Sequence, residues 1–102
     1  MISVIFYKNG SDFTGFEFSG HSDYAEEGFD IVCTAVSSAA YLTANNLELF
    51  SVKTDVTLSD GYMKLTVENA DKASLLIEGL YRHTLQLEEQ YENDIKLKIS
   101  EV

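Results

Sequence analysis

A chain of 102 residues, of which 45% are hydrophobic, is long enough for one compact domain with a core but too short for two such domains. Its formal net charge of −10 disfavours direct binding to nucleic acid or to anionic lipid, and it favours either simple solubility or attraction of a basic protein. The first ten residues lack the pattern of a signal peptide, and no stretch reaches the roughly 18 to 20 apolar residues of a membrane span, so we expect a single cytoplasmic domain over residues 1–102.

The first part of the chain predicts a β-hairpin, then a loop, then a helix. Residues 20–29 contain two glycines and no sustained period, which indicates a loop. Asp30 is a good N-cap, and apolar residues follow it at helical spacing to about residue 50. The hairpin is predicted from alternating apolar residues on both sides of an Asn9-Gly10 turn: Ile2, Val4, Phe6, Phe16 and Phe18.

The second part repeats the order of hairpin and helix and adds a strand. Alternation over residues 52–67, interrupted by Asp60-Gly61, predicts the second hairpin. Helical spacing then begins near the capping candidates Asn69 and Asp71 and continues to about Asn93. Residues 95–100 alternate again, which predicts a last strand with one face exposed to water.

The element order ββαββαβ with short connections is typical of an α+β domain. We expect a mainly antiparallel sheet with two helices packed on one face.

Two residue types with catalytic chemistry lie on either side of the expected loop: His21 and the only cysteine, Cys33. With Asp30 as N-cap, Cys33 is the third helical residue, where unpaired N–H groups and the helix dipole lower a thiol pKa from roughly 8.5. The same N–H groups can donate to the oxyanion of a tetrahedral intermediate. One imidazole can both deprotonate the thiol and protonate a leaving amine, so His21 is the candidate base.

Spacing alone leaves other interpretations of these residues open. A cysteine near a helix start is commonly a small buried hydrophobic residue. A low-pKa cysteine is also suited to redox sensing, although the chain has no second cysteine to resolve an oxidised one. A metal site is disfavoured because no paired ligands such as Cys-x-x-Cys occur, and His83 lies off the apolar stripe of the second helix, as a surface residue would.

The residues around this pair form a more specific pattern. Gly20-His21-Ser22, Tyr24-Ala25, Gly28, Asp30-Ile31-Val32-Cys33 and Ala35-Val36-Ser37 together resemble the signature of the ribosomal-processing cysteine protease (Prp) family. The resemblance extends over essentially all 102 residues and includes length, acidic balance and element order.

The resemblance implies a cysteine endopeptidase that removes a short N-terminal extension from a bacterial large-subunit ribosomal protein. His21 is then the base and Cys33 the nucleophile, with no cofactor and no metal. Family resemblance also implies a homodimer and a loop that rearranges around Gly20 and Gly28 when substrate binds.

Further residues are assigned supporting roles. Ser37 lies one helical turn after Cys33 and so faces the same side, where the resemblance implies a role in shaping the site or binding substrate, together with Gly20. Close packing within the run of small residues around Ser37 is the alternative. Asp30 is expected to cap the helix and could orient His21. No third residue is required, so a dyad is predicted; Asp23, Glu26 and Glu27 are possible orienters, and Tyr24 and Phe29 possible walls of an apolar subsite. A ribosome-associated binding module without catalysis is the main alternative.

Overall fold

The computed structural model describes the backbone of residues 1–20 and 27–102 and the side chains of residues 1–20 and 31–102. The chain forms seven elements in the predicted order ββαββαβ. Their bounds are β1 Ile2–Asn9, β2 Asp12–Ser19, α1 Glu27–Leu49, β3 Thr54–Ser59, β4 Tyr62–Val67, α2 Ala70–Gln90 and β5 Ile95–Glu101.

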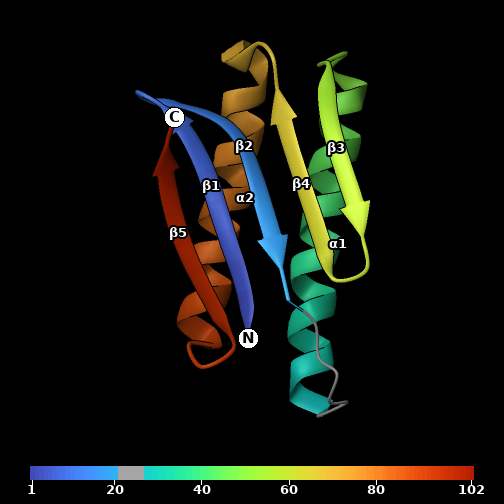
Figure 1. Ribbon diagram of the computed structural model, residues 1–102, viewed down its shortest axis with the longest axis vertical. Coiled ribbons are helices and arrows are strands. Elements are labelled where there is room, and N and C mark those ends of the chain that lie inside the picture. Colours follow the sequence, from blue (N-terminus) through green and yellow to red (C-terminus); the bar gives the residue numbers. More distant parts are fainter. Residues whose placement is uncertain (21–26) are drawn as a thin grey trace.

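The five strands form one sheet in the order β3-β4-β2-β1-β5, and both helices lie on the same face of it (Figure 1). All neighbouring strands are antiparallel except β1 and β5, which are parallel. The prediction of an α+β domain with a mainly antiparallel sheet and two helices on one face is therefore confirmed. Within the part of the chain that the structure describes, no helix combines the length and apolar character needed to cross a bilayer.

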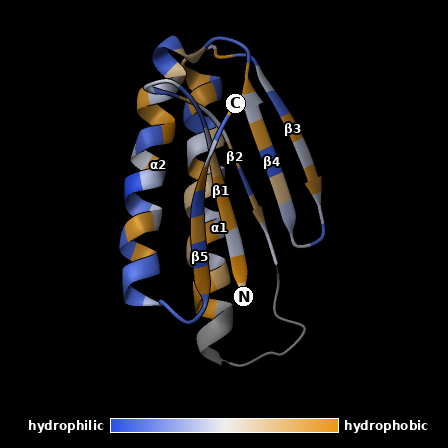
Figure 2. Ribbon diagram, turned by 60° about the vertical axis from the view of Figure 1, so that its left-hand side comes forward, coloured by the Kyte–Doolittle hydropathy of each residue, from blue (hydrophilic) through white to orange (hydrophobic). Residues whose placement is uncertain are grey.

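Both hairpins turn at the predicted glycines. Gly10 has φ +64° and Gly61 has φ +69°, a backbone region that glycine enters without steric cost. In β1 and β4, buried apolar residues alternate with less buried ones, whereas all residues of β3 are exposed. The hydropathy colours alternate along the strands (Figure 2).

The core lies between the sheet and the two helices. Phe6 and Phe16 are fully buried, and the Phe6 ring packs edge-on against Tyr81 of α2 with centroids 5.2 Å apart. The register between β1 and β2 shifts between Tyr7 and Lys8, so Phe13 is also buried although it is an odd number of residues from Phe16. This irregularity adds a third phenylalanine to the core.

The second helix starts as predicted and ends slightly earlier. Asn69 is the N-cap, and its side chain accepts a hydrogen bond of 3.0 Å from the backbone N–H of Asp71. The helix ends at Gln90 rather than near Asn93, because Tyr91 adopts a non-helical C-cap conformation. A short turn then connects the chain to β5.

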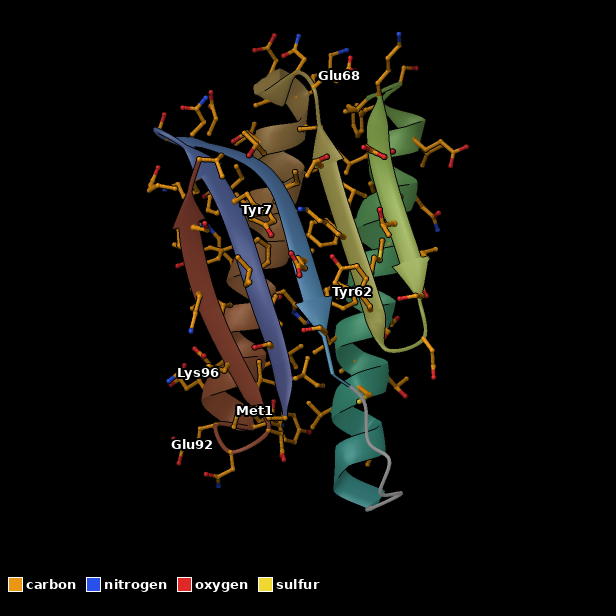
Figure 3. All side chains as sticks on the ribbon, viewed as in Figure 1. Met1, Tyr7, Tyr62, Glu68, Glu92 and Lys96 are labelled. Atoms are coloured by element: carbon orange, nitrogen blue, oxygen red, sulfur yellow. The ribbon has the colours of Figure 1, made fainter. Side chains whose placement is uncertain are left out.

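The sheet face that is turned away from the helices carries a polar cluster, in which Figure 3 labels Tyr7 and Tyr62. The Tyr7 hydroxyl donates a hydrogen bond to the Glu17 carboxylate, and the Lys64 ammonium lies 5.2 Å from the centroid of the Tyr7 ring. The hydrogen bond to Glu17, with a contribution from partial burial, raises the pKa of Tyr7 to about 12. Partial burial and the same carboxylate raise the pKa of Tyr62.

Candidate active site

The single cysteine lies on α1, on the side of the helix that meets the sheet. Cys33 is half-buried and packs against the core, next to the fully buried Val32. Helical spacing puts Ser37 and Tyr41 one and two turns further along the same side of α1. These three side chains therefore form one row on the helix.

One cavity opens beside this row, and we name it the Cys33 cavity. It has a volume of about 140 Å³. Its floor is apolar and is formed by Phe18 of β2, Met63 of β4 and Val36 of α1. The full set of bordering residues is Ile2, Phe18, Gly20, Cys33, Val36, Ser37, Tyr41, Ser59, Gly61, Tyr62 and Met63.

A second, shallower depression runs along the exposed side of α1, and we name it the α1 trough. It has a volume of about 640 Å³ and is bordered by Cys33, Thr34, Ser37, Ser38, Tyr41, Leu42 and Asn45. Cys33, Ser37 and Tyr41 border both the cavity and the trough. Cys33 thus lies between the two depressions.

The structure brings three of the predicted site residues together. Gly20, Cys33 and Ser37 all border the Cys33 cavity although they come from the end of β2 and from α1. His21 lies outside the described residues, as do Asp23, Tyr24 and Glu26. The second histidine, His83, is exposed on α2 as predicted.

Gly20 is fixed by close contacts at the edge of the cavity. Its φ is +115°, and a Cβ atom at this position would lie 2.4 Å from the carbonyl oxygen of Met1. Its N–H donates a hydrogen bond of 2.9 Å to the carbonyl oxygen of Gly61. Glycine is therefore needed here for both the backbone conformation and the close approach of the first residues of the chain.

The start of α1 differs from the prediction. The helix begins at Glu27, so Asp30 is its fourth residue rather than its N-cap, and Cys33 is its seventh residue rather than its third. The expected loop over residues 20–29 is correspondingly shorter, and Gly28 lies in the first turn. In the sequence, Glu27 and Asp30 both fall in this first turn, where acidic residues are favoured by the helix dipole.

This shift changes the electrostatic argument for the thiol. The dipole effect falls off within the first turn of a helix, and Cys33 lies in the second turn. The unpaired N–H groups belong to the first four residues of the helix. The helix terminus therefore offers Cys33 less stabilisation of a thiolate, and fewer oxyanion donors, than the sequence suggested.

Sequence reasoning missed several residues around Cys33. Tyr41 could have been predicted from the sequence, because the four-residue spacing from Cys33 through Ser37 continues to this position. Tyr62 and Met63 come from β4, and Ile2 from β1, so only the strand order shows that they border the same cavity. Their sequence positions carry no signal of this proximity.

The metal alternative finds no support within residues 1–20 and 31–102, where no three histidine, cysteine, aspartate or glutamate side chains are grouped to hold an ion. A site that included His21 lies outside the described residues.

Comparison with known proteins decides the family. The family model described as cysteine protease Prp matches residues 1–96. The chain belongs to the cysteine protease Prp family. A curated Prp relative, the ribosomal processing cysteine protease Prp of Bacillus subtilis, is 30% identical over 91 residues, which cover 80% of this chain and 81% of the relative. Family membership assigns cysteine protease activity to the chain.

Solved Prp structures have the same fold. An essential ribosomal processing protease Prp from S. aureus, in complex with a substrate peptide, has 25% identity and a TM-score of 0.89, with 98% of this chain and 100% of that chain covered. The same S. aureus protease with a covalently linked product peptide has 27% identity and a TM-score of 0.86 over the same shares of the two chains. The Prp fold extends over nearly the whole chain.

Proposed function

We propose that this chain is a cysteine endopeptidase that removes the short N-terminal extension of a bacterial large-subunit ribosomal protein and so supports ribosome assembly. The observation that carries the proposal is the position of Cys33, the only cysteine, in the wall shared by the Cys33 cavity and the α1 trough. Membership of the Prp family supplies the reaction class. The S. aureus relative was solved with a covalently linked product peptide, and a covalent bond to the product is what a nucleophilic side chain would form.

In the proposed reaction, His21 takes the proton of the Cys33 thiol, and the thiolate attacks the carbonyl carbon of the scissile peptide bond. Collapse of the tetrahedral intermediate breaks the C–N bond, and the imidazolium of His21 gives its proton to the leaving amine. Water, deprotonated by His21, then hydrolyses the thioester and regenerates Cys33. The dyad needs no metal and no cofactor.

The chain geometry supports His21 as the partner. His21 follows Gly20 directly, and consecutive Cα atoms are about 3.8 Å apart, so the histidine is one residue from the edge of the Cys33 cavity. Ser37 is proposed to shape the cavity, and Asp30 to assist the histidine or the helix start. Gly28 is proposed as a hinge that lets the intervening residues rearrange on substrate binding.

The charge of the chain supports a basic substrate protein. A net charge of −10 attracts a basic ribosomal protein and repels RNA. The proposed partner is therefore the ribosomal protein itself, without direct contact between this chain and RNA. The cytoplasm is the proposed location, because ribosomal proteins are made there and its reducing conditions keep a cysteine nucleophile as a thiol.

A homodimer is part of the proposal. The β3 edge of the sheet and the end of α1 expose large apolar side chains that a second copy could cover. Their exposed fractions are 40% for Val56, 55% for Leu58, 80% for Leu49 and 53% for Phe50. Sedimentation velocity at micromolar concentration should give twice the mass of the chain, and Leu58→Asp with Val56→Asp should return it to the monomer mass.

The decisive experiment is peptide cleavage. A peptide that copies the N-terminal extension and the first residues after it is incubated with the protein and analysed by mass spectrometry. We expect two fragments with the parent chain, none with Cys33→Ala or Cys33→Ser, and none with His21→Ala. Gln86→Ala is the control, because it truncates an exposed side chain of α2 that borders neither the Cys33 cavity nor the α1 trough, and it should leave cleavage unchanged.

The cleavage assay, together with a peroxide treatment, separates the alternatives. Fragments produced by Cys33→Ala would disprove the proposal. Peptide that is bound but left intact by the parent chain would indicate a binding module. An intermolecular disulfide formed under mild peroxide, without cleavage, would indicate a redox sensor.

A further inference from the structure

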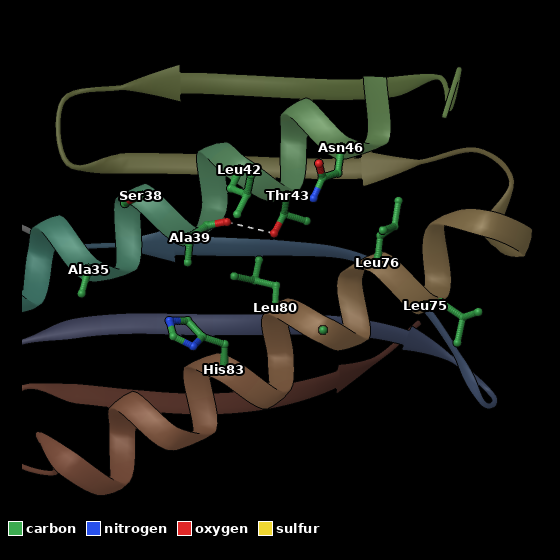
Figure 4. A pocket seen from close by; sticks show the side chains of 11 residues that line it. Ala35, Ser38, Ala39, Leu42, Thr43, Asn46, Leu75, Leu76, Leu80 and His83 are labelled. Atoms are coloured by element: carbon green, nitrogen blue, oxygen red, sulfur yellow. Dashed lines mark hydrogen bonds between the residues drawn. The ribbon is translucent and has the colours of Figure 1, made fainter. Parts of the chain in front are cut away.

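A groove between the two helices has no role in the proposed chemistry. It has a volume of about 600 Å³ and lies on the outer side of the helix layer (Figure 4). Residues of α1 form one wall and residues of α2 form the other: Ala35, Ser38, Ala39, Leu42, Thr43 and Asn46 on α1, and Leu75, Leu76, Gly79, Leu80 and His83 on α2. We name it the α1–α2 groove.

The groove is apolar in a chain that is otherwise strongly charged. Among the described residues that border it, none is acidic, lysine or arginine, and His83 is the one titratable side chain. Leu42 is 60% exposed and Leu75 is 75% exposed. Exposed leucines at the edge of an apolar hollow are typical of a ligand-binding surface.

Gly79 keeps the α2 wall low. Glycine inside a helix is less favourable than alanine by about 1 kcal/mol. A Cβ atom at Gly79 would meet no described atom within 4 Å, so packing does not require glycine here. The helix therefore carries an unfavourable residue at a position where its visible effect is to leave the groove open.

The groove adjoins the candidate active site. Ser38 and Leu42 border both the α1–α2 groove and the α1 trough, and the trough reaches Cys33. At 1.5 Å per helical residue, Ser38 lies about 8 Å and Leu42 about 14 Å along α1 from Cys33.

We propose that the α1–α2 groove is an exosite, which holds an apolar segment of the polypeptide substrate that begins about two to four residues from the scissile bond. The distance follows from the roughly 3.3 Å that each extended residue spans. This proposal rests on the proposed protease function. Continuity with Cys33 favours the substrate as occupant over a second copy of the chain, for which the β3 edge offers a separate apolar surface.

The test fills the groove and varies the length of the substrate. Gly79→Leu adds bulk at the open position without removing any contact and with a better helix former, so the variant should fold. Glu89→Leu is the matched control, because it puts the same side chain on an exposed position of α2 that does not border the groove. Substrates are a peptide with eight residues on each side of the scissile bond and two truncated forms with two residues left on one side or the other.

We expect Gly79→Leu to lower kcat/KM for the long peptide about tenfold, mainly through KM, as expected for loss of uniform binding. One of the two truncations should erase the difference between Gly79→Leu and the parent chain, and that truncation identifies the arm that occupies the groove. Gly79→Ala should give a smaller loss with the long peptide, and Glu89→Leu should give none.

Three results would overturn the exosite. The first is equal cleavage of the long peptide by Gly79→Leu and the parent chain. The second is an equal loss of kcat/KM with the long and the truncated peptides. The third is a change in the sedimenting mass of Gly79→Leu without a loss of kcat/KM specific to the long peptide, which would assign the groove to a second copy of the chain. Cleavage of the truncated peptides by the parent chain would still establish the protease, so failure of the exosite and failure of the proposed function are distinguishable.

Discussion

The backbone N–H of Gly20 donates a 2.9 Å hydrogen bond to the carbonyl oxygen of Gly61. This bond ties the end of β2 to the turn between β3 and β4, and both glycines border the Cys33 cavity. The residue that precedes His21 is thus held in place by the sheet itself. Rigid backbone of this kind is what holds the side chains of a site in a fixed geometry.

We predict that Gly20→Ala destabilises the chain by about 2 to 4 kcal/mol, because an added Cβ would combine an unfavourable positive φ with a clash against backbone atoms of Met1. Gly10→Ala is the control. Gly10 also has positive φ, but a Cβ there meets no described atom within 4 Å, so its cost should be about 1 kcal/mol. Urea unfolding followed by circular dichroism measures both, and equal losses would contradict the close-approach argument.

Ser74 is predicted to anchor the bulged part of β2 to α2. Its hydroxyl oxygen accepts a 2.9 Å hydrogen bond from the backbone N–H of Phe13, and the pair is buried. Ser74→Ala leaves that N–H without its acceptor and should cost about 1 to 3 kcal/mol of unfolding free energy. Ser11→Ala, at an exposed position of the neighbouring turn, should cost less than about 0.5 kcal/mol. A neutral Ser74→Ala would show that the bond does not hold the bulge.

The pair of Tyr7 and Glu17 is predicted to make stability depend on alkaline pH. The pKa of Tyr7 is raised to about 12 in the folded chain, against about 10 in the unfolded chain. The folded state therefore holds the proton more tightly, so the contribution is fully present below pH 10 and is lost as pH rises from 10 to 12. Because Tyr7 is partly exposed to solvent, we expect about 1 kcal/mol.

Tyr7→Phe provides the comparison for this effect. The difference in unfolding free energy between the parent and Tyr7→Phe should be constant from pH 7 to 9 and should shrink towards pH 12, as measured by urea unfolding at each pH. A difference that grows with pH would reverse the sign and refute the assignment.

Ser37 is predicted to set the space beside Cys33. Because it borders both the Cys33 cavity and the α1 trough, Ser37→Leu should displace a bound peptide from Cys33 by an ångström or more and lower kcat/KM by about 10²-fold. Ser37→Ala keeps the space and should retain cleavage within about tenfold. Thermal unfolding of both variants distinguishes a blocked site from a damaged fold, and full activity of Ser37→Leu would exclude Ser37 from the site.

Much of the fold was predictable because its determinants are local. The turns at Asn9-Gly10 and Asp60-Gly61 depend on one glycine each, and the strands and helices beside them on side-chain periods of 2 and 3.6 residues. The N-cap at Asn69 is likewise a contact between residues two positions apart. The start of α1 was predicted four residues late, because Asp30 suits both an N-cap and an acidic first turn, and the pattern does not distinguish them.

The sequence by itself determined the element order, the two catalytic candidates and the family, because each depends on residue types at fixed short spacings. Only the tertiary structure placed Ile2, Phe18 and Met63 around Cys33, since these residues meet through the strand order β3-β4-β2-β1-β5. It also showed the shift in register that buries Phe13 and the open space at Gly79. Such features depend on pairing between distant segments, and the side-chain period of one segment carries no information about its partner.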